Sequence, residues 1–467
     1  MFGSVQTSRT TGKASAADRY FAERYPGYVL KDFGCDKDGV FQFVLEPEHD
    51  GVQCPRCGRY CTRFHEARTV EVFDMDLFAG GPVKVVILVR RVRCRCGCHR
   101  TEPLPDWILP GHRVTKRLAA FVQKALLKLR ISNTDIAALT GLAWQLIKDI
   151  DKQALKPLFD KPDIGQCVHL AIDEISIHKN HRYATVFMDL VNRQTMFVVQ
   201  GKRQVDLVAT FKKIQEQCPH LRSVSVDMNA GFPKLVSKYL PQCKLAYDRF
   251  HVVANFNRDV LVEARKTELA RARKAYLHVP RRQRSDEDVR RLNEQLQILR
   301  SAEWLVLRDE SVLKADKLEQ LNRLRENNAL FRDLYPLAAQ LRAVWTADNE
   351  TQARELLNDT IQICKAIAQE HDFKPIERFA KMLERRAEGI VNACVVGYGT
   401  NILEGANNTA KVIKRVGYGY QDFEYFALKL KAAFPGRRFK REHAGRYTPF
   451  TLYWQGSVET LNLPQKN

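Results

Sequence analysis

The chain has 467 residues, 45% of them hydrophobic and 28% charged, which is enough for about three domains with sizeable cores. Lysine and arginine number 75 against 54 acidic residues, and the net charge of +21 indicates a polyanionic partner, with nucleic acid the first expectation. No segment approaches the roughly 18 apolar residues of a membrane helix, and the amino-terminal residues lack the apolar stretch of a secretory signal. We therefore expect a cytoplasmic protein without membrane contact, in which structural disulfides are disfavoured.

Two cysteine-rich segments lie on either side of a predicted β-hairpin. The segments are CPRCGRYC, which begins at residue 54, and CRCGCH, which begins at residue 94. Between them, VEVFDMD and VKVVILVRRVR are typical of two strands, and Gly80-Gly81-Pro82 predicts the turn that joins them.

Four thiolates from two such segments bind zinc in a closed tetrahedral site, and the predicted role of this site is structural. The preferred ligands are Cys54, Cys57, Cys94 and Cys98. Cys96 or His99 is the alternative fourth ligand, and a group of free buried thiols is the competing interpretation.

The segment ISNTDIAALTGLAWQLIKDIDKQAL, which begins at residue 131, has the spacing of a helix-turn-helix. Ser132 and Asp135 predict the start of its first helix, and Gly141 predicts the turn. We expect the second helix to bury one face that includes Ala143. Its polar face would enter a major groove, and the residues predicted to contact DNA there are Gln145, which would read base edges, and Lys148 and Lys152, which would contact phosphate. An ordinary helical hairpin is the competing interpretation.

Residues 167–247 predict the order β-β-β-α-β-α-β, which requires a sheet covered by helices. Asp173 follows the apolar run VHLAI and Asp227 follows SVSV, so we expect both acids at the ends of neighbouring strands, about 4.8 Å apart. Glu404 lies near the start of the predicted helix LEGANNTAKVIKR. Three such carboxylates would hold a pair of divalent cations, with Mg²⁺ suited to an oxygen-only site.

The same helix has two predicted faces. Glu404, Lys411 and Arg415 share one face, from which Lys411 and Arg415 would meet a DNA strand, and a stripe of small and apolar residues would pack on the sheet. Residues 249–395 between the sheet and this helix are typical of helices throughout.

Other interpretations of the acids remain open at this point. A single acid at a strand end is usually a solvated terminus, and Glu174 and Asp189 are rival candidates, although strand alternation points Asp173 and Glu174 to opposite faces. Asp248 and His251, in YDRFH, would lie close to the metals or form a structural hydrogen bond where the last strand meets a helix.

Seven stretches together resemble the ISL3 family of bacterial insertion-sequence transposases. They are CPRCG, RRVRCRCGC, DIAALTGLAWQLIKDI, AIDEISIHKNHRYATVFMDL, VSVDMNAGFPKLV, YDRFHVVANFN and NILEGANNTAKVIKRVGYGY. The resemblance implies an α/β RNase H-like catalytic domain interrupted by an all-α insertion and preceded by a zinc-ribbon-like module and a helix-turn-helix. It also implies that Asp173, Asp227 and Glu404 are a DDE triad, and Lys411 matches a spacing of several DDE transposases.

The resulting domain boundaries are an N-terminal arm (1–45), a zinc-binding β-hairpin module (46–110), a helix-turn-helix (111–162), an RNase H-like core (163–254), an all-helical insertion (255–395), the last helical part of the core (396–435) and a basic tail (436–467).

The resemblance implies a function on DNA in a bacterial nucleoid. The chain would bind the terminal inverted repeats of an insertion sequence, cleave DNA there with two Mg²⁺ or Mn²⁺ ions, and transfer the freed strand to target DNA, as a homodimer and with structural Zn²⁺. The alternatives are a DNA-binding regulator with an inactive RNase H-like scaffold, or an RNase H-like structure-specific nuclease.

Overall fold

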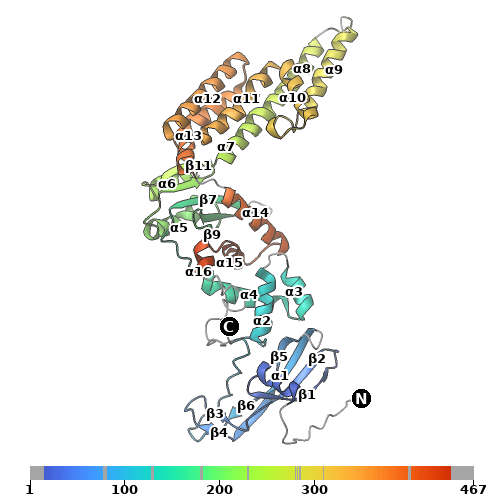
Figure 1. Ribbon diagram of the computed structural model, residues 1–467, viewed down its shortest axis with the longest axis vertical. Helices are drawn as coiled ribbons and strands as arrows, with labels where there is room; N and C mark the ends of the chain where they lie inside the picture. Colours follow the sequence, from blue (N-terminus) through green and yellow to red (C-terminus); the bar gives the residue numbers. More distant parts are fainter. Residues whose placement is uncertain are drawn as a thin grey trace, which may run out of the picture. The chain divides into compact units, whose positions relative to one another are not determined.

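Figure 1 shows the computed structural model of the chain, which describes residues 15–76, 81–127, 131–178, 182–228, 231–278, 280, 282, 285–308, 310–397 and 401–442. The chain divides into two compact units. Unit 1 comprises Met1–Lys161, Val412–Gly419 and Lys440–Asn467, and unit 2 comprises Pro162–Lys411 and Tyr420–Phe439. Among the described residues, no helix has the length and apolar character needed to span a membrane.

A four-stranded sheet forms the first part of unit 1, in the order β1-β2-β6-β5. Its strands are β1 (Tyr28–Cys35), β2 (Phe41–Pro47), β5 (Phe64–Asp76) and β6 (Gly81–Val92). β5 and β6 pair antiparallel along their length, which confirms the predicted hairpin, although the predicted turn residue Gly80 lies outside the described residues. Val83, Val85 and Ile87 are buried in alternation along β6, because successive side chains of a strand point to opposite faces.

The structure differs from the expectation of an arm over residues 1–45. From Ala16 onward this stretch forms helix α1 (Ala16–Arg24), which packs on β1, and two strands of the same sheet as the hairpin. A bulge between Leu30 and Asp32 breaks the alternation of β1, and β1 lies at the sheet edge, where charged side chains are tolerated. The strand therefore lacks the pattern from which a strand is predicted.

Three helices form the second part of unit 1: α2 (Lys116–Leu127), α3 (Asn133–Thr140) and α4 (Trp144–Phe159). α3 begins where predicted, with the Ser132 hydroxyl accepting from the Asp135 N–H at 3.1 Å and the Asp135 carboxylate accepting from the Ser132 N–H at 2.8 Å. Gly141 ends α3 at φ 68°, in the left-handed region that glycine enters without strain. Ala143 is exposed at the N-cap of α4, and the expectation that it lies on the buried face was wrong.

A buried carboxylate, Asp74 on β5, joins the parts of unit 1. Its side chain is 0% exposed and accepts hydrogen bonds from Tyr25 at 2.9 Å and from Thr115, just before α2, at 2.6 Å. Arg24 and Arg117 complete the network at 3.3 and 2.6 Å. Because these partners come from the end of α1 and from the start of α2, α1, the sheet and α2 share one charged centre.

Unit 2 contains a five-stranded sheet in the order β11-β10-β7-β8-β9. Its strands are β7 (His169–His178), β8 (Arg182–Asp189), β9 (Gln194–Gln200), β10 (Ser223–Val226) and β11 (Lys244–Tyr247). β10 runs parallel to both β7 and β11, whereas β7, β8 and β9 are antiparallel. Together with α5 (Gln204–Gln217) and α6 (Gly231–Tyr239), this is the predicted β-β-β-α-β-α-β order.

The two faces of this sheet have different partners. Leu170 and Ile172 on β7 belong to the same buried core as Phe211 on α5 and Phe232 on α6. On β7, Ala171 and Asp173 alternate with these residues and point to the other face of the sheet. There α14 (Asn401–Val416) contacts β7 through a hydrogen bond described below. α15 (Phe423–Ala433) packs on β9 at the sheet edge (Figure 1).

A long helical segment follows β11 in unit 2. It consists of α7 (Arg249–Phe256), a π-helical turn (Asn257–Leu261), α8 (Val262–His278), α9 (Asp286–Ser301), α10 (Ala315–Asn327), α11 (Ala329–Ala343), α12 (Glu350–Glu370) and α13 (Lys374–Val396). In Figure 1 these helices lie side by side beyond β11. The prediction that residues 249–395 are helical is confirmed for most of the described residues. α13 returns to β11, where Gly389 meets the Tyr247 ring so closely that an added Cβ would lie 2.5 Å from it.

The Asp74 network yields a prediction for stability. Asp74→Ala would leave two arginines facing a buried site without their carboxylate, and we expect the free energy of unfolding to fall by about 3–5 kcal/mol. Urea titration of the full chain measures it. The control is Glu66→Ala, which removes the partner of an exposed pair with Arg91 at 3.1 Å and should cost at most about 1 kcal/mol. Equal effects of the two substitutions would contradict the importance of the buried network.

Candidate functional site

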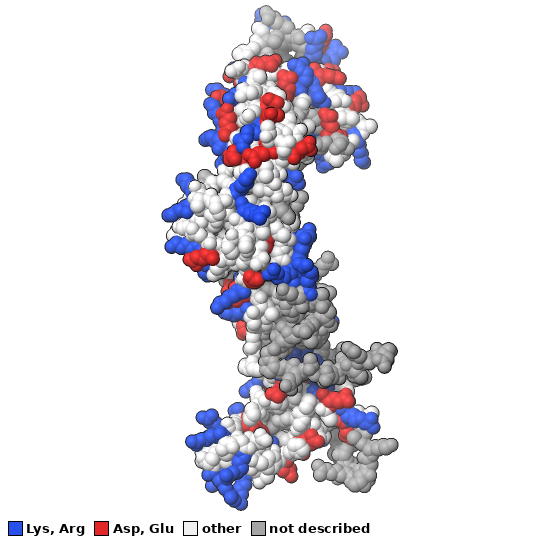
Figure 2. Space-filling view, turned by 60° about the vertical axis from the view of Figure 1, so that its left-hand side comes forward, with Lys and Arg blue, Asp and Glu red and all other residues white. Residues whose placement is uncertain are grey.

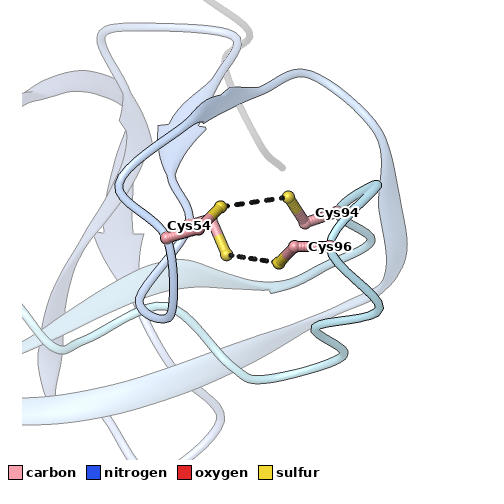
Figure 3. A group of neighbouring side chains, drawn as sticks. Cys54, Cys94 and Cys96 are labelled. Carbon is pink, nitrogen blue, oxygen red and sulfur yellow. Dashed lines mark hydrogen bonds between the residues drawn. The ribbon is translucent and has the colours of Figure 1, made fainter.

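Four cysteines converge in unit 1 from the two cysteine-rich segments. The sulfurs of Cys54, Cys57, Cys94 and Cys96 all lie within 4.8 Å of one another. The Cys54 and Cys96 sulfurs are 3.7 Å apart (Figure 3). The Cys57 and Cys94 sulfurs are 3.6 Å apart. Sulfurs bound to one tetrahedral zinc at about 2.3 Å lie about 3.8 Å from each other. The four thiols are therefore compatible with a zinc ion.

The structure groups Cys96, the alternative ligand, with the other three cysteines and leaves Cys98 out of the group. Cys98 is buried beside it, and its backbone carbonyl accepts from the Cys94 N–H at 3.1 Å. In both segments a glycine with positive φ follows the second grouped cysteine: Gly58 at 71° and Gly97 at 80°. A Cys-Gly pair is thus the sequence signal that distinguishes Cys96 from Cys98.

Backbone groups favour the thiolate at one of these positions. Burial alone raises the pKa of a thiol, but the N–H groups of Arg56 and Cys57, with the neighbouring thiols, lower the pKa of Cys54 to about 6. The Arg56 N–H donates to the Cys54 sulfur at 3.5 Å. Because a metal binds the thiolate, this turn prepares a ligand at neutral pH.

The cysteine segments also carry positive charge. Segments 54–63 and 93–100 contain no acidic residue. Their exposed arginines are Arg56, Arg59, Arg63, Arg93, Arg95 and Arg100. Figure 2 shows Lys and Arg gathered at the lower end of the view, where Figure 1 has the short strands β3 (Val52–Gln53) and β4 (Tyr60–Cys61) of this region. We call these six residues the arginine surface.

In the helix-turn-helix, the predicted DNA-contacting residues lie on α4. Gln145 is exposed near the start of α4 and donates to Asp149 at 3.0 Å, while Lys148 and Lys152 are half-buried. The opposite side of α4 is buried through Ile147 and Ile150. The predicted division into a buried face and a polar face therefore holds from Ile147 onward.

In unit 2, the register of the sheet aligns two of the predicted acids. β10 pairs parallel with β7 so that Ser225 lies beside Ala171 and Val226 beside Ile172. Asp227, the next residue, continues this alignment beside Asp173, and alternation turns both side chains to the face opposite the α5 core. Asp227 directly follows β10, as expected. Asp173 lies in the middle of β7, because β7 continues in antiparallel pairing with β8 beyond the end of β10.

Both carboxylate oxygens of Asp173 are hydrogen-bonded. One accepts from the Glu174 backbone N–H at 2.7 Å, and the other accepts from the side-chain amide of Asn407 on α14 at 2.5 Å. Burial raises the pKa of Asp173, and Asp227 raises it further, while these hydrogen bonds and nearby His251 lower it. Our sequence reasoning did not predict a role for Asn407, although its position, three residues after Glu404, was a usable signal.

Two helices contact Asp227 and the residue that follows it. His251 on α7 has Nδ1 3.3 Å from the Asp227 carboxylate and Nε2 3.6 Å from the Asp248 carboxylate. Asp248 also caps α7, accepting from the Phe250 N–H at 2.9 Å. From α13, the Arg386 guanidinium donates to the carbonyl of Met228, the residue after Asp227, at 2.6 Å. Asp248 thus forms the expected junction hydrogen bond, and His251 lies between two acids.

The rival acids have other partners. Glu174 points to the opposite face of the sheet from Asp173 and pairs with Lys202 at 3.5 Å. One oxygen of the buried Asp189 accepts from the N–H groups of Val191 at 2.9 Å and Asn192 at 3.1 Å. Asp189 therefore stabilises the turn after β8.

Glu404 is exposed on α14, three residues before Asn407. The predicted stripe of α14 is buried at Ala406, Ala410 and Ile413, and Lys411 and Arg415 are exposed, as expected. Over the described residues, the groups with three or more ligand atoms within 4.8 Å of one another are the four cysteines and Asp333-Glu370-His371. The three predicted acids are not brought that close together.

The second of these groups is a hydrogen-bonded contact between α11 and the end of α12. The His371 ring nitrogen lies 2.7 Å from the Asp333 carboxylate, which also pairs with Arg332 at 3.3 Å. The Asp333 carboxylate therefore has Arg332 and His371 as partners within the protein.

Two family models and several known transposases are similar to this chain. A family model described as a transposase, DDE_Tnp_ISL3, matches residues 170–430, and one for the helix-turn-helix domain of transposase family ISL3 matches residues 102–155. The transposase for insertion sequence element IS1001 of Bordetella parapertussis is 32% identical over 406 residues, 86% of this chain and 93% of that protein. The chain belongs to the ISL3 family of transposases. The transposase for IS1557 of Mycobacterium tuberculosis (strain ATCC 25618 / H37Rv) is a more distant relative, 23% identical over 79% of this chain and 82% of that protein.

Membership of the ISL3 family makes the chain a DNA-binding transposase and implies the use of divalent metal ions. The net charge of +21 is in keeping with a DNA partner. Neither a regulator with an inactive scaffold nor a structure-specific nuclease is favoured by these matches.

The cysteine group yields a prediction for metal content. We expect the purified protein to carry about one zinc ion per chain, and Cys96→Ser to lower this content strongly, because three thiolates hold the ion less tightly than four. Atomic absorption on the full chain measures it. Cys98→Ser is the matched control and should keep its zinc, since Cys98 lies outside the group. Loss of zinc in the Cys98 variant alone would instead favour the ligand set expected from the sequence.

Proposed function

We propose that Asp173, Asp227 and Glu404 are a DDE triad for cleavage at transposon ends and for joining of the freed 3′-hydroxyl to target DNA. In this proposal the five-stranded sheet is an RNase H-like core, and the helices between residues 255 and 395 are an insertion before its last helical part. Two divalent cations, Mg²⁺ or Mn²⁺, would activate the attacking oxygen and stabilise the leaving oxygen.

The observation that carries the proposal is the parallel register of β10 with β7, which supports Asp227 and Asp173 as neighbours on one face. Glu404 is supported through Asn407, because residues three apart lie on the same side of a helix and Asn407 donates to Asp173. Oxygen-only ligands of this kind suit magnesium.

The roles of the neighbouring residues follow from their contacts. Asn407 and the Glu174 N–H fix the two oxygens of Asp173, and His251 fixes the carboxylate of Asp227. Exposed Lys411 and Arg415 on α14 would contact phosphate of the bound strand and stabilise the charge that develops there.

We assign recognition of the terminal inverted repeats to the helix-turn-helix and the zinc-binding module. Gln145 would read base edges, and Lys148 and Lys152 would contact phosphate. The arginine surface would add sequence-independent contacts to the backbone, with Zn²⁺ on Cys54, Cys57, Cys94 and Cys96 holding the two segments together. A homodimer is proposed because two transposon ends must be brought together.

The triad can be tested by isosteric substitution. We expect Asp173→Asn, Asp227→Asn and Glu404→Gln each to reduce end cleavage and strand joining by more than about a hundredfold, because each removes a charged ligand. A transposition assay with a donor carrying the element ends and a free target plasmid measures both steps. Gel-shift binding to the ends should persist in every variant.

The matched control is Asp189→Asn, which removes a buried carboxylate of the same sheet. The asparagine oxygen can keep both backbone hydrogen bonds, so cleavage should stay near that of the unaltered protein. Cleavage that survives in the Asp173 or Glu404 variants but is lost in the Asp189 variant would mean that the triad is misassigned.

The arginine surface can be tested through salt dependence. Each phosphate contact contributes about −0.9 to the slope of log binding constant against log salt concentration. Replacing Arg59, Arg63 and Arg95 with alanine should therefore make this slope shallower by roughly two to three. Fluorescence anisotropy with a labelled end duplex, across a salt series, measures the slope.

The control for this experiment removes equal charge elsewhere. Lys317, Arg323 and Arg354 pair with Asp316, Glu319 and Glu388 respectively, so their triple alanine variant should leave the slope almost unchanged. Equal slopes in the two triple variants would contradict DNA contact by the arginine surface.

A further inference from the structure

Asn407 occupies a position where an apolar residue would be expected. On α14 its neighbours along the same side, Leu403 and Ala410, are at most 3% exposed, and Asn407 itself is 7% exposed. An amide in such a stripe loses its contacts with water, so its hydrogen bonds must come from the protein.

Only half of that requirement is met. The amide nitrogen donates to Asp173, but the amide oxygen is buried and has no hydrogen-bond partner among the residues that the structure describes. The carboxylate dictates this orientation, because ionised Asp173 is an acceptor only and would repel the amide oxygen. The Asn407 side chain therefore keeps its hydrogen bond to Asp173 and leaves its own amide oxygen without a partner among the described residues. This oxygen lies close to Asp173, because it belongs to the same amide as the donating nitrogen.

We propose that Asn407 is a positioning residue of the metal site, a proposal that rests on the proposed function of Asp173. Its amide fixes the rotation of the Asp173 carboxylate, so that the carboxylate meets a divalent cation in one orientation. When the cation is bound, one of its waters would donate to the amide oxygen. Groups that hold a metal ligand in this way typically change the affinity for the metal tenfold to a hundredfold when removed.

Asn392 provides an internal comparison. This residue on α13 is 5% exposed, and its amide nitrogen donates to the Leu245 carbonyl at 2.9 Å. Its oxygen is likewise buried and without a partner in the described part of the chain. Its acceptor is a backbone carbonyl, not one of the proposed metal ligands. The two asparagines therefore share burial, donation and the orphan oxygen, and they differ in whether a functional carboxylate is the acceptor.

The test is Mn²⁺ binding to the full-length protein without DNA, followed through the electron paramagnetic resonance signal of free Mn²⁺. We expect Asn407→Leu and Asn407→Ala to weaken Mn²⁺ binding tenfold to a hundredfold. Two replacements of different volume separate loss of the amide from misfit of the new side chain. Asn392→Leu, the matched control, should keep the affinity of the unaltered protein.

Thermal melting supplies a second readout. Asn407→Leu and Asn392→Leu each remove a buried amide with an orphan oxygen, so the two melting temperatures should be similar. Asp173→Asn in the same titration should abolish binding at the site. If it does and both Asn407 variants bind Mn²⁺ normally, the positioning role is overturned while the triad stands. If Asp173→Asn binds Mn²⁺ normally, the proposed metal site itself fails.

Discussion

A half-buried carboxylate in the middle of a sheet needs hydrogen-bond donors, and this need explains how α14 is joined to the sheet of unit 2. Asp173 lies on the central strand β7, and its carboxylate accepts two hydrogen bonds. One donor is the neighbouring Glu174 N–H, and the other must come from outside the strand. That donor is Asn407, 234 positions later in the sequence. The bond brings α14 to the sheet, and because Glu404 lies one helical turn away, the same bond sets the approximate place of the third acid.

The second acid depends on topology. β10 has four residues and lies between β7 and β11, parallel to both, so its end is fixed by pairing on two sides. α5 and α6 supply the connections that parallel strands require, and their apolar faces cover one side of the sheet. The other side is left for polar side chains, and this division explains why Asp173 and Asp227 share a face while Glu174 pairs with Lys202 behind it.

Local pattern was enough to predict the strands and helices of unit 2, the hairpin β5–β6 and the start of α3. These features depend on residues that are neighbours in the sequence, such as Ser132 and Asp135. Asn407 could not be derived in this way, because its burial has meaning only once α14 lies on β7. Cys96 and Cys98 are both one short turn from Cys94, and the positive φ of Gly97 decides which sulfur points to the group. β1 was missed because its bulge and its edge position remove the usual alternation.

The helical segment leaves the sheet and returns to it at the same strand. α7 begins two residues after β11, and α13 comes back against β11, with Gly389 on the Tyr247 ring and Asn392 bonded to the Leu245 carbonyl. Since the ends of the segment meet, its length adds little to the entropy of closing the sheet. Both ends of the segment also contribute to the site. Arg386 on α13 donates to the Met228 carbonyl, and His251 on α7 lies beside the Asp227 carboxylate. A change within the helical segment that moved α7 relative to α13 would therefore alter the contacts of Asp227 and Met228 directly, and those of Asp173 only indirectly.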